Sequence, residues 1–207
     1  MRRQMLGAVA MALMLAGAVA SAQDAARAGG APGGGQGRGG GRGPAAPPLV
    51  MTTTSFEDGG IIPAKFVGGM GVSPELKWTQ VPMGTQSFVL LMHDPDVALA
   101  RGTLDVTHWL VWNIPGTATG LPEGVMPMAE LPDGTRQVSL RAAGYMGPGA
   151  PATGPHHHYT FELYALDTKL DVPAGTPQDA ATTRAAVIKG IEGHALGKAV
   201  LVGRFHQ

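Results

Sequence analysis

Long runs of hydrophobic residues, broken by glycine and proline, dominate the last three-quarters of the chain. Residues 87–92 (SFVLLM) form a continuous apolar run of strand length, and residues 107–115 (THWLVWNIP) form another that is rich in aromatic and β-branched residues. Residues 198–205 (KAVLVGRF) have the composition of a last strand. Residues 52–68 suggest an early hairpin that turns at the Asp-Gly-Gly of 58–60. The pattern therefore predicts a mainly β domain.

Residues 157–166 (HHYTFELYAL) alternate in a way that assigns their side chains to two faces of one strand. His157, Tyr159 and every second residue after them fall on one face, and His158 begins the opposite face. The three consecutive histidines at 156–158 therefore cannot all point the same way. They do not form a three-ligand metal cluster on one face of the strand.

One helix is predicted near the C-terminus. Thr176 is a capping residue, and Pro177 follows at the first helical position, where proline is favoured. The stretch that follows is rich in helix formers, and four apolar residues spaced along it are expected to face the sheet: Ala181, Ala185, Ile188 and Ile191. Helix and strands together predict a β-rich, sandwich-like domain with short helices near the C-terminus.

Residues 1–22 have the features of a secretory signal peptide. Arg2 and Arg3 give a positive start, the apolar run 5–20 follows, and Ala20-Ser21-Ala22 matches the small-residue pattern of a cleavage site. A retained membrane anchor is the alternative, but the run is short for a span, which needs about 20 apolar residues. We therefore expect export, to the periplasm or out of the cell.

Residues 23–48 are predicted to be a flexible linker, and residues 49–207 a single folded domain. The segment 29–43 has ten glycines in fifteen residues and too few apolar side chains to offset the entropy cost of ordering. The domain carries 10 Lys and Arg residues and 14 Asp and Glu residues, a net charge of −4, which argues against general nucleic-acid binding. With no cysteine in the sequence, disulfides, a thiol nucleophile and a cysteine-type zinc site are excluded.

Polar groups capable of chemistry stand beside the apolar runs at three places. Residues 93–96 (HDPD) follow the first long run, His108 opens the second, and residues 156–159 (HHHY) come after the glycine- and proline-rich loop 144–155. Burying carboxylates and imidazoles costs free energy unless they pair with one another, so we expect these segments to converge. Imidazole, tyrosine hydroxyl and loop amide groups can donate to a phosphate or carboxylate, and the two aspartates suit an ammonium group.

Each segment also has a plainer interpretation. Asp-Pro-Asp alone is usually a turn, and a lone His108 before an apolar strand is more often structural. A divalent metal held by His93, Asp94, Asp96 and His108 is a further alternative, and it would support metal-assisted hydrolysis. None of the five serines lies in the G-x-S-x-G motif of a hydrolase nucleophile.

The order of several motifs resembles the phosphatidylethanolamine-binding protein family, in particular its bacterial YbhB/YbcL branch, often called Raf kinase inhibitor-like. The matching stretches span about residues 55–207 and include SPELKWTQVPMGTQSFVLLMHDPDV, HWLVWNIP, LPEG, GYMGPGAPATGPHHHYTFELYALD and GHALGKAVLVGRF. The resemblance implies a mainly β fold with two antiparallel sheets and short C-terminal α-helices. It also implies a small pocket for phosphate-like or carboxylate groups, including the phosphoethanolamine headgroup.

The resemblance further implies which residues bind the ligand. The family's Asp-Pro-Asp corresponds to residues 94–96, and its H-R-Y segment to residues 157–159, where His158 takes the place of the arginine. Its loop, G-P-C-P-P or G-P-P, reads GPGAP at 147–151 here, so we expect a looser rim. The resulting ligand-binding set is Asp94, Pro95, Asp96, His108, Pro151, His157 and Tyr159.

The sequence thus predicts an exported binding protein without enzymatic activity and without a cofactor. Its expected ligand is a small anion or a phosphorylated headgroup, and its pocket rim is a candidate surface for a protein partner. A homodimer is left open, and nucleic acid is not an expected partner. The alternatives are a metal-assisted hydrolase and a protein-interaction domain with a vestigial pocket.

Overall fold

The computed structural model describes residues 47–68 and 71–207 of the chain. The predicted signal peptide, most of the predicted linker and residues 69 and 70 lie outside the described residues. Within the two described ranges, no helix combines the length and the hydrophobicity that a membrane span needs.

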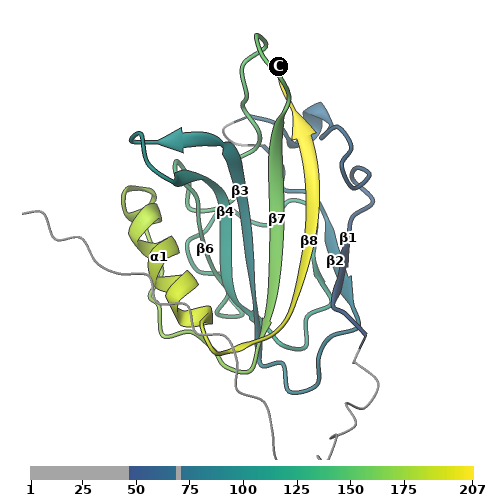
Figure 1. The fold of residues 1–207 in the computed structure, drawn as a ribbon. Helices are drawn as coiled ribbons and strands as arrows, with labels where there is room; N and C mark the ends of the chain where they lie inside the picture. The colour runs from purple at the N-terminus through teal and green to yellow at the C-terminus, as the bar shows by residue number, and fades with distance from the viewer. Residues whose placement is uncertain (1–46, 69–70) are drawn as a thin grey trace, which may run out of the picture. The chain divides into compact units, whose positions relative to one another are not determined.

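The larger of two antiparallel sheets has five strands in the order β6-β4-β3-β7-β8 (Figure 1). These strands are β3 (Ser87–Leu99), β4 (Leu104–Pro115), β6 (Arg136–Val138), β7 (His157–Leu166) and β8 (Ala195–Phe205). β3 lies at the centre and pairs with both β4 and β7. Its first six residues, 87–92, are all buried, because both faces of the sheet are covered. That burial explains why the run is continuous rather than alternating.

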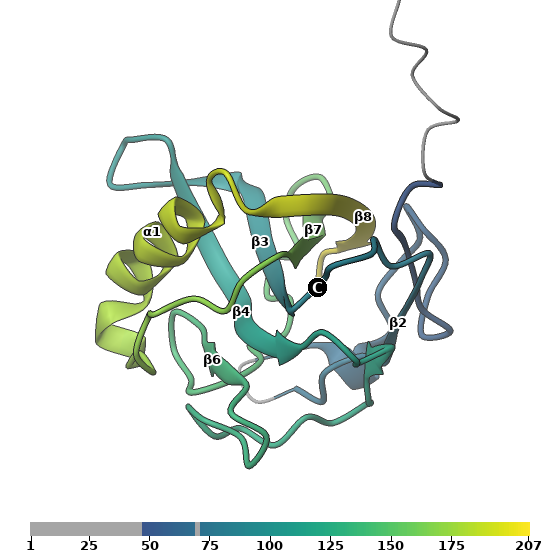
Figure 2. The ribbon, with the colours of Figure 1, turned by 90° about the horizontal axis from the view of Figure 1, so that it is seen from below.

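A small sheet covers one face of the large sheet, and a helix covers the other. The small sheet contains β1 (Val50–Thr52), β2 (Leu76–Thr79) and β5 (Gly120–Leu121) in the order β1-β2-β5. Figure 2 shows β2 and the helix α1 (Ala180–Ile191) on opposite sides of the large sheet. The chain is therefore mainly β, with two antiparallel sheets, as predicted.

Two hydrophobic cores follow from these layers. Between the sheets, the Trp78 ring of β2 lies 5.1 Å from the Phe88 ring of β3, in a core that includes the alternate residues of β7 from Tyr159 onward. The second core lies under α1 and contains Val89, Leu91 and Trp112. Odd and even residues of β3 therefore serve different cores, and the same alternation continues as far as Asp94.

The C-terminal region has a single α-helix, and the buried face of that helix differs from the prediction. A 3₁₀ turn (Pro177–Asp179), with Pro177 at its first position as expected, leads into α1. The buried residues of α1 are Ala180, Thr183, Val187 and Ile191. Ala181 and Ala185 are exposed and Ile188 is half-buried, so the predicted face was wrong for the two alanines. Alanines and threonines around this helix give too weak a contrast to show which side docks.

β3 is longer than the predicted strand 87–92. It continues through Pro95 to Leu99, and β4 begins at Leu104 instead of Thr107. The pairing passes from Asp94–Val106 to Leu99–Leu104, which is five residue steps on β3 against two on β4. Such a bulge is one of the few places where a sheet accommodates proline, which has no N–H to donate.

Residues 52–68 do not form the predicted hairpin. The segment instead runs beside the end of β8, where the Gly59 N–H donates to the Val202 carbonyl over 2.7 Å. Ile61 forms a parallel bridge with Arg204. The Asp-Gly-Gly turn is real, but it redirects the chain along β8 rather than back onto its own strand.

Candidate functional site

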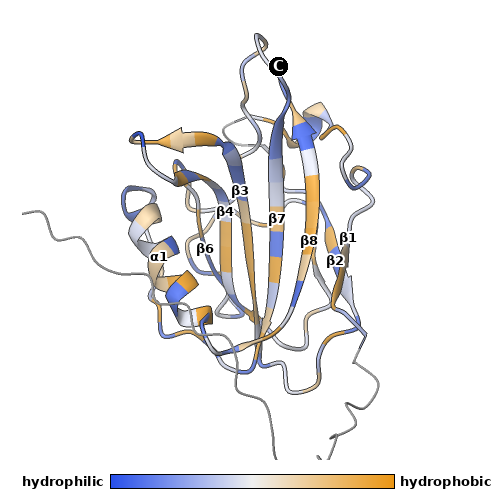
Figure 3. Cartoon of the chain, in the orientation of Figure 1, coloured by the Kyte–Doolittle hydropathy of each residue, from blue (hydrophilic) through white to orange (hydrophobic). Residues whose placement is uncertain are grey.

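A cavity of about 360 Å³ lies where β3, β4 and β7 meet the loop that precedes β7. Figure 3 shows that the start of β7 and the adjoining part of β3 are hydrophilic, whereas β3 below this region is mainly hydrophobic and β7 alternates. The polar and charged side chains that line the cavity are Asp94, His108, Arg141, His157 and Tyr159. Segments distant in the sequence therefore supply one shared site.

Asp94 faces the cavity because it lies on the inner side of β3, two residues beyond the core residue Met92. Its side chain is nearly fully buried, with the residue 3% exposed. A buried carboxylate needs hydrogen-bond donors to compensate for lost hydration. Asp94 has two: the His157 Nδ1–H donates to Oδ2 over 2.8 Å, and the backbone N–H of Asp96 donates to Oδ1 over 3.0 Å.

The contact with Asp94 defines the chemistry of His157. Since a carboxylate only accepts hydrogen bonds, Nδ1 of His157 carries the proton. The other ring nitrogen, Nε2, is the one left to interact with a ligand. The carboxylate therefore orients the imidazole of β7, as second partners of functional histidines commonly do.

His108 is held in a similar way by the backbone. Its Nδ1–H donates to the Met146 carbonyl over 2.8 Å, and the residue is only 5% exposed. Burial lowers the pKa of His108 below its usual range, although hydrogen bonding to the Met146 and Gly147 backbone and the nearby charge of Asp94 act in the opposite direction. The ring is therefore mainly neutral at pH 7, with Nε2 unprotonated.

Tyr159 supplies a hydroxyl that stays protonated. The Gly149 N–H donates to the Tyr159 oxygen over 3.3 Å. Burial raises the pKa of Tyr159 to about 12. Its ring stands edge-on to the His108 ring, at 5.0 Å between centroids and 88° between planes. Since the oxygen already accepts a hydrogen bond from the backbone, its own O–H is available to donate to a ligand.

The loop 147–151 forms the rim of the cavity and is tied to a second loop. The Gly147 N–H donates to the Gly68 carbonyl and the Gly68 N–H donates to the Pro148 carbonyl, both over 2.9 Å. A Cβ at Gly147 would stand 2.4 Å from the Phe66 carbonyl oxygen, so only glycine fits there. Ala150 and Pro151 of the GPGAP sequence also line the cavity.

Pro95 and Asp96 of the predicted ligand-binding set do not line the cavity. Both are exposed on the bulge of β3. Asp96 Oδ2 accepts hydrogen bonds from the His158 backbone N–H, over 2.6 Å, and from His158 Nδ1, over 3.0 Å. Asp96 therefore fastens β3 to the start of β7 from outside the cavity.

His93 lies on the opposite face of the sheet from His108. Its Nδ1–H donates to Asp105 over 2.7 Å, and Asp105 also accepts a hydrogen bond from Arg184 of α1. Burial acts to raise the pKa of Asp105, but hydrogen bonds from Arg184 and His93 outweigh it and hold that pKa below its usual range.

The residues of the metal alternative are therefore not brought together. His93 belongs to the α1 face, Asp94 and His108 to the cavity, and Asp96 to the outer surface. Within the described part of the chain, no group of three or more His, Cys, Asp or Glu residues is placed to hold a metal ion.

Part of the lining was missed by sequence reasoning. Arg141, in the loop after β6, brings an exposed positive charge to the cavity. Apolar residues absent from the predicted set also contribute, among them Val97, Leu99, Val106, Leu140 and Met146. The signal available for Arg141 was its position shortly before the predicted glycine-rich loop, whereas the apolar residues depend on the bulge of β3.

Comparison with known proteins identifies the family. A family model described as "Phosphatidylethanolamine-binding protein" matches residues 52–206. The chain belongs to the phosphatidylethanolamine-binding protein family. A UPF0098 protein of Methanothermobacter thermautotrophicus is 38% identical over 160 residues, which cover 76% of this chain and 98% of the relative. YbhB of Escherichia coli is 36% identical over 135 residues, 60% of this chain and 83% of YbhB.

Other relatives of this family member agree with that assignment. The crystal structure of E. coli YbcL superimposes with a TM-score of 0.59 at 28% identity, covering 77% of this chain and 98% of YbcL. These matches confirm the predicted YbhB/YbcL resemblance. A Mycobacterium tuberculosis relative named as the lipoprotein LppC is 37% identical over 166 residues, 78% of this chain and 74% of LppC.

Proposed function

We propose that the cavity holds a small anion of the phosphate or carboxylate type, including the headgroup phosphoethanolamine. The observation that carries the proposal is the convergence of His108, His157 and Tyr159, from β4 and β7, on one cavity. Two imidazole rings are each oriented by a hydrogen bond at Nδ1, and one phenol remains protonated. The phenol donates as it stands, and each oriented ring presents Nε2, which donates when the ring carries a second proton; a bound anion favours that charged form.

The charges around the cavity favour a ligand that carries both signs. Arg141 offers a positive charge to an anionic oxygen. The Asp94 carboxylate already accepts two hydrogen bonds, and its remaining lone pairs can accept another from an ammonium group. A zwitterion such as phosphoethanolamine can interact with Arg141 and Asp94 at once, whereas inorganic phosphate can interact favourably only with Arg141.

The apolar part of the lining supports a role in binding a carbon-containing headgroup. Val97, Leu99 and Val106 add apolar surface beside the donors. Ligand sites of this size commonly combine an apolar wall with a few polar groups that set the orientation. These apolar contacts support the proposed role in binding.

We propose further that the protein acts outside the cytoplasm. The apolar segment and small-residue cleavage pattern of residues 1–22 support this. The relative LppC, named as a lipoprotein, supports export within the family. Detection of the mature N-terminus at Gln23 in a periplasmic or secreted fraction tests this part.

Titration calorimetry with phosphoethanolamine tests the proposed ligand. Asp94→Asn removes the buried charge but keeps an oxygen that can accept from the Asp96 N–H. Because a hydrogen bond to a charged group contributes about 1.5–3 kcal/mol, we expect binding to weaken roughly tenfold to a hundredfold. Asp96→Asn is the matched control, since Asp96 lies outside the cavity, and should change the dissociation constant less than twofold. Absence of binding to wild type at millimolar phosphoethanolamine and phosphate contradicts the proposal.

A further inference from the structure

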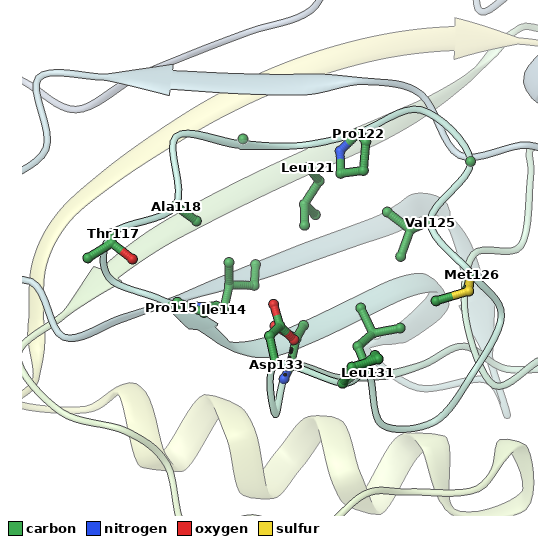
Figure 4. A pocket seen from close by; sticks show the side chains of 14 residues that line it. Ile114, Pro115, Thr117, Ala118, Leu121, Pro122, Val125, Met126, Leu131 and Asp133 are labelled. Carbon is green, nitrogen blue, oxygen red and sulfur yellow. Dashed lines mark hydrogen bonds between the residues drawn. The ribbon is translucent and has the colours of Figure 1, made fainter.

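A second hollow, of about 530 Å³, lies on the loops that follow β4 (Figure 4). None of its lining residues lines the anion cavity. Figure 4 shows the side chains of Ile114, Leu121, Val125 and Leu131 around one shared space. A volume of this size lies within the range of about 300–1,000 Å³ typical of small-molecule sites.

One wall of the hollow is fixed by hydrogen bonds to β2 and the segment before it. The Trp78 Nε1–H donates to the Ala118 carbonyl over 2.7 Å. Buried Ser73 holds the next stretch twice: its carbonyl accepts from the Gly124 N–H and its hydroxyl oxygen from the Val125 N–H, each over 3.0 Å. This wall cannot move inward to fill the space without breaking these hydrogen bonds.

The opposite wall is fixed in the same way. The fully buried Gln137 donates from Nε2 to the carbonyls of Met126, over 2.5 Å, and Met128, over 2.8 Å. The turn that follows is closed by the Leu131 N–H, which donates to the Thr135 carbonyl over 2.7 Å. The hollow is therefore preformed, which lowers the entropy cost of binding a ligand.

The lining of the hollow is mainly apolar, and its polar residues are Asp133, Thr117 and Thr135. Ile114 and Leu121 form the buried floor, with exposures of 2% and 7%, and the flexible side chain of Met126 stands 53% exposed at the rim. Methionine adapts its shape to different ligands. An apolar hollow with an adaptable rim favours a ligand with a hydrocarbon or aromatic body.

Asp133 is the only charged residue in the lining. Its Oδ1 accepts a hydrogen bond from the Thr135 N–H over 2.9 Å, which fixes the carboxylate in the turn. Asp133 lines the hollow together with Ile114 and Leu131 (Figure 4). Its Oδ2 remains available for a ligand, and no cationic side chain lines the hollow to neutralise it.

We propose that this hollow binds a small organic cation, with an apolar body between the two walls and a protonated amine on Asp133. The charge complementarity is specific to this place: the nearby acids Glu123 and Glu130 are each paired, with Lys65 and Arg136 respectively, and neither lines the hollow. A ligand that carries only a positive charge lacks the anionic group proposed for the first cavity, so the two sites bind different compounds.

Three ligands with the same phenylbutyl body test the proposal: 4-phenylbutylamine, 4-phenylbutanol and 4-phenylbutyrate. Methyl groups of ¹³C-labelled methionine report the location, since Met126 lines the hollow and Met146 lines the anion cavity. We expect the amine to shift Met126 and to bind roughly two- to fivefold more tightly than the alcohol, as for an exposed ion pair. Of the three ligands, 4-phenylbutyrate should bind the hollow most weakly.

Two variants separate the charge from the apolar body. Asp133→Asn keeps the oxygen that accepts from Thr135 and should make the amine and the alcohol bind equally. Leu131→Ala should weaken both by a similar factor, because it removes apolar contact. Glu130→Gln is the control: it removes a neighbouring acid outside the lining and should leave the preference for the amine unchanged. Circular dichroism melting verifies that each variant is folded.

Three results overturn the proposal. One is a Met126 methyl that does not move at millimolar amine. Another is equal affinity of the wild type for amine and alcohol, which would make the hollow a neutral apolar site. The last is an amine response at Met146 instead of Met126, which would place the cation in the anion cavity.

Discussion

Sulfate binding should be coupled to protonation of His108. Burial lowers the pKa of His108, so the ring is mainly neutral at pH 7 and its only N–H, at Nδ1, donates to the Met146 carbonyl. An anion in the cavity favours the charged ring, which can donate from Nε2 as well. Binding therefore takes up a proton, and affinity rises as the pH falls. Sulfate is the right probe because its charge stays constant between pH 5.5 and 7.5.

The size of the effect follows from the attraction between a bound anion and a protonated ring in contact with it. Two unit charges about 4 Å apart attract by roughly 4 kcal/mol at an effective dielectric constant near 20. Since one pKa unit corresponds to about 1.36 kcal/mol, a bound anion can raise the pKa of His108 by up to about three units. Affinity then changes by up to about tenfold per pH unit between the free and bound pKa values. We expect sulfate to bind at least about tenfold more tightly at pH 5.5 than at pH 7.5.

His108→Asn is the matched variant for this experiment. The asparagine amide nitrogen replaces Nδ1 as the donor to the Met146 carbonyl, but the side chain does not titrate. Calorimetric titration at five pH values should show that sulfate affinity rises steeply in the wild type as the pH falls. In the variant, the increase in affinity should be smaller by about tenfold. A wild-type affinity that is flat across this range, or the same pH slope in His108→Asn, refutes the reasoning.

Three further changes have defined outcomes. Tyr159→Phe removes the hydroxyl that accepts from Gly149, and calorimetry should show sulfate affinity reduced about fivefold, as for one neutral hydrogen bond. The low pKa of Asp105 stabilises the fold above about pH 4, and this contribution is lost as the pH falls through the folded-state pKa. In urea denaturation, the free energy of unfolding of Arg184→Met should therefore fall less between pH 6 and pH 3 than that of the wild type. Gly147→Ala forces a Cβ against a backbone oxygen; a thermal melt should show a midpoint lower by several degrees, together with weaker sulfate binding.

The strands of the large sheet could be predicted from the sequence because their patterns are strong. In β7, the alternation from His157 to Ala165 matches the observed inner face residue by residue, and it placed His157 and Tyr159 on one side. Continuous apolar residues at the start of β3 marked a central strand. In both cases the hydrophobic period alone was sufficient.

The end of β3 could not be predicted in the same way. Strand alternation puts Asp94 and Asp96 on one face, but the bulge turns Asp96 outward to His158. Bulge position and register depend on pairing with a distant strand, which a single sequence does not reveal. The same limit led to the metal alternative. His93 and His108 lie on the neighbouring strands β3 and β4, but their side chains point to opposite faces of the sheet.

Loops and helix faces were the other source of error. The Asp-Gly-Gly at 58–60 signals a turn, but the partner of the turning segment is β8, almost 150 residues later. The second hollow likewise depends on Ser73, whose hydroxyl binds the Val125 N–H 52 residues later, and on Gln137, whose amide binds two carbonyls of the preceding loop. Local patterns therefore predict elements, whereas tertiary hydrogen bonds decide where the loops lie.

A crystal structure of the protein soaked in sulfate at pH 5.5 is the most direct test of the anion cavity. We predict tetrahedral density within hydrogen-bonding distance of the His108 and His157 Nε2 atoms and the Tyr159 hydroxyl. Density only on outer surfaces, with ordered water at all three of these atoms, would contradict the central claim.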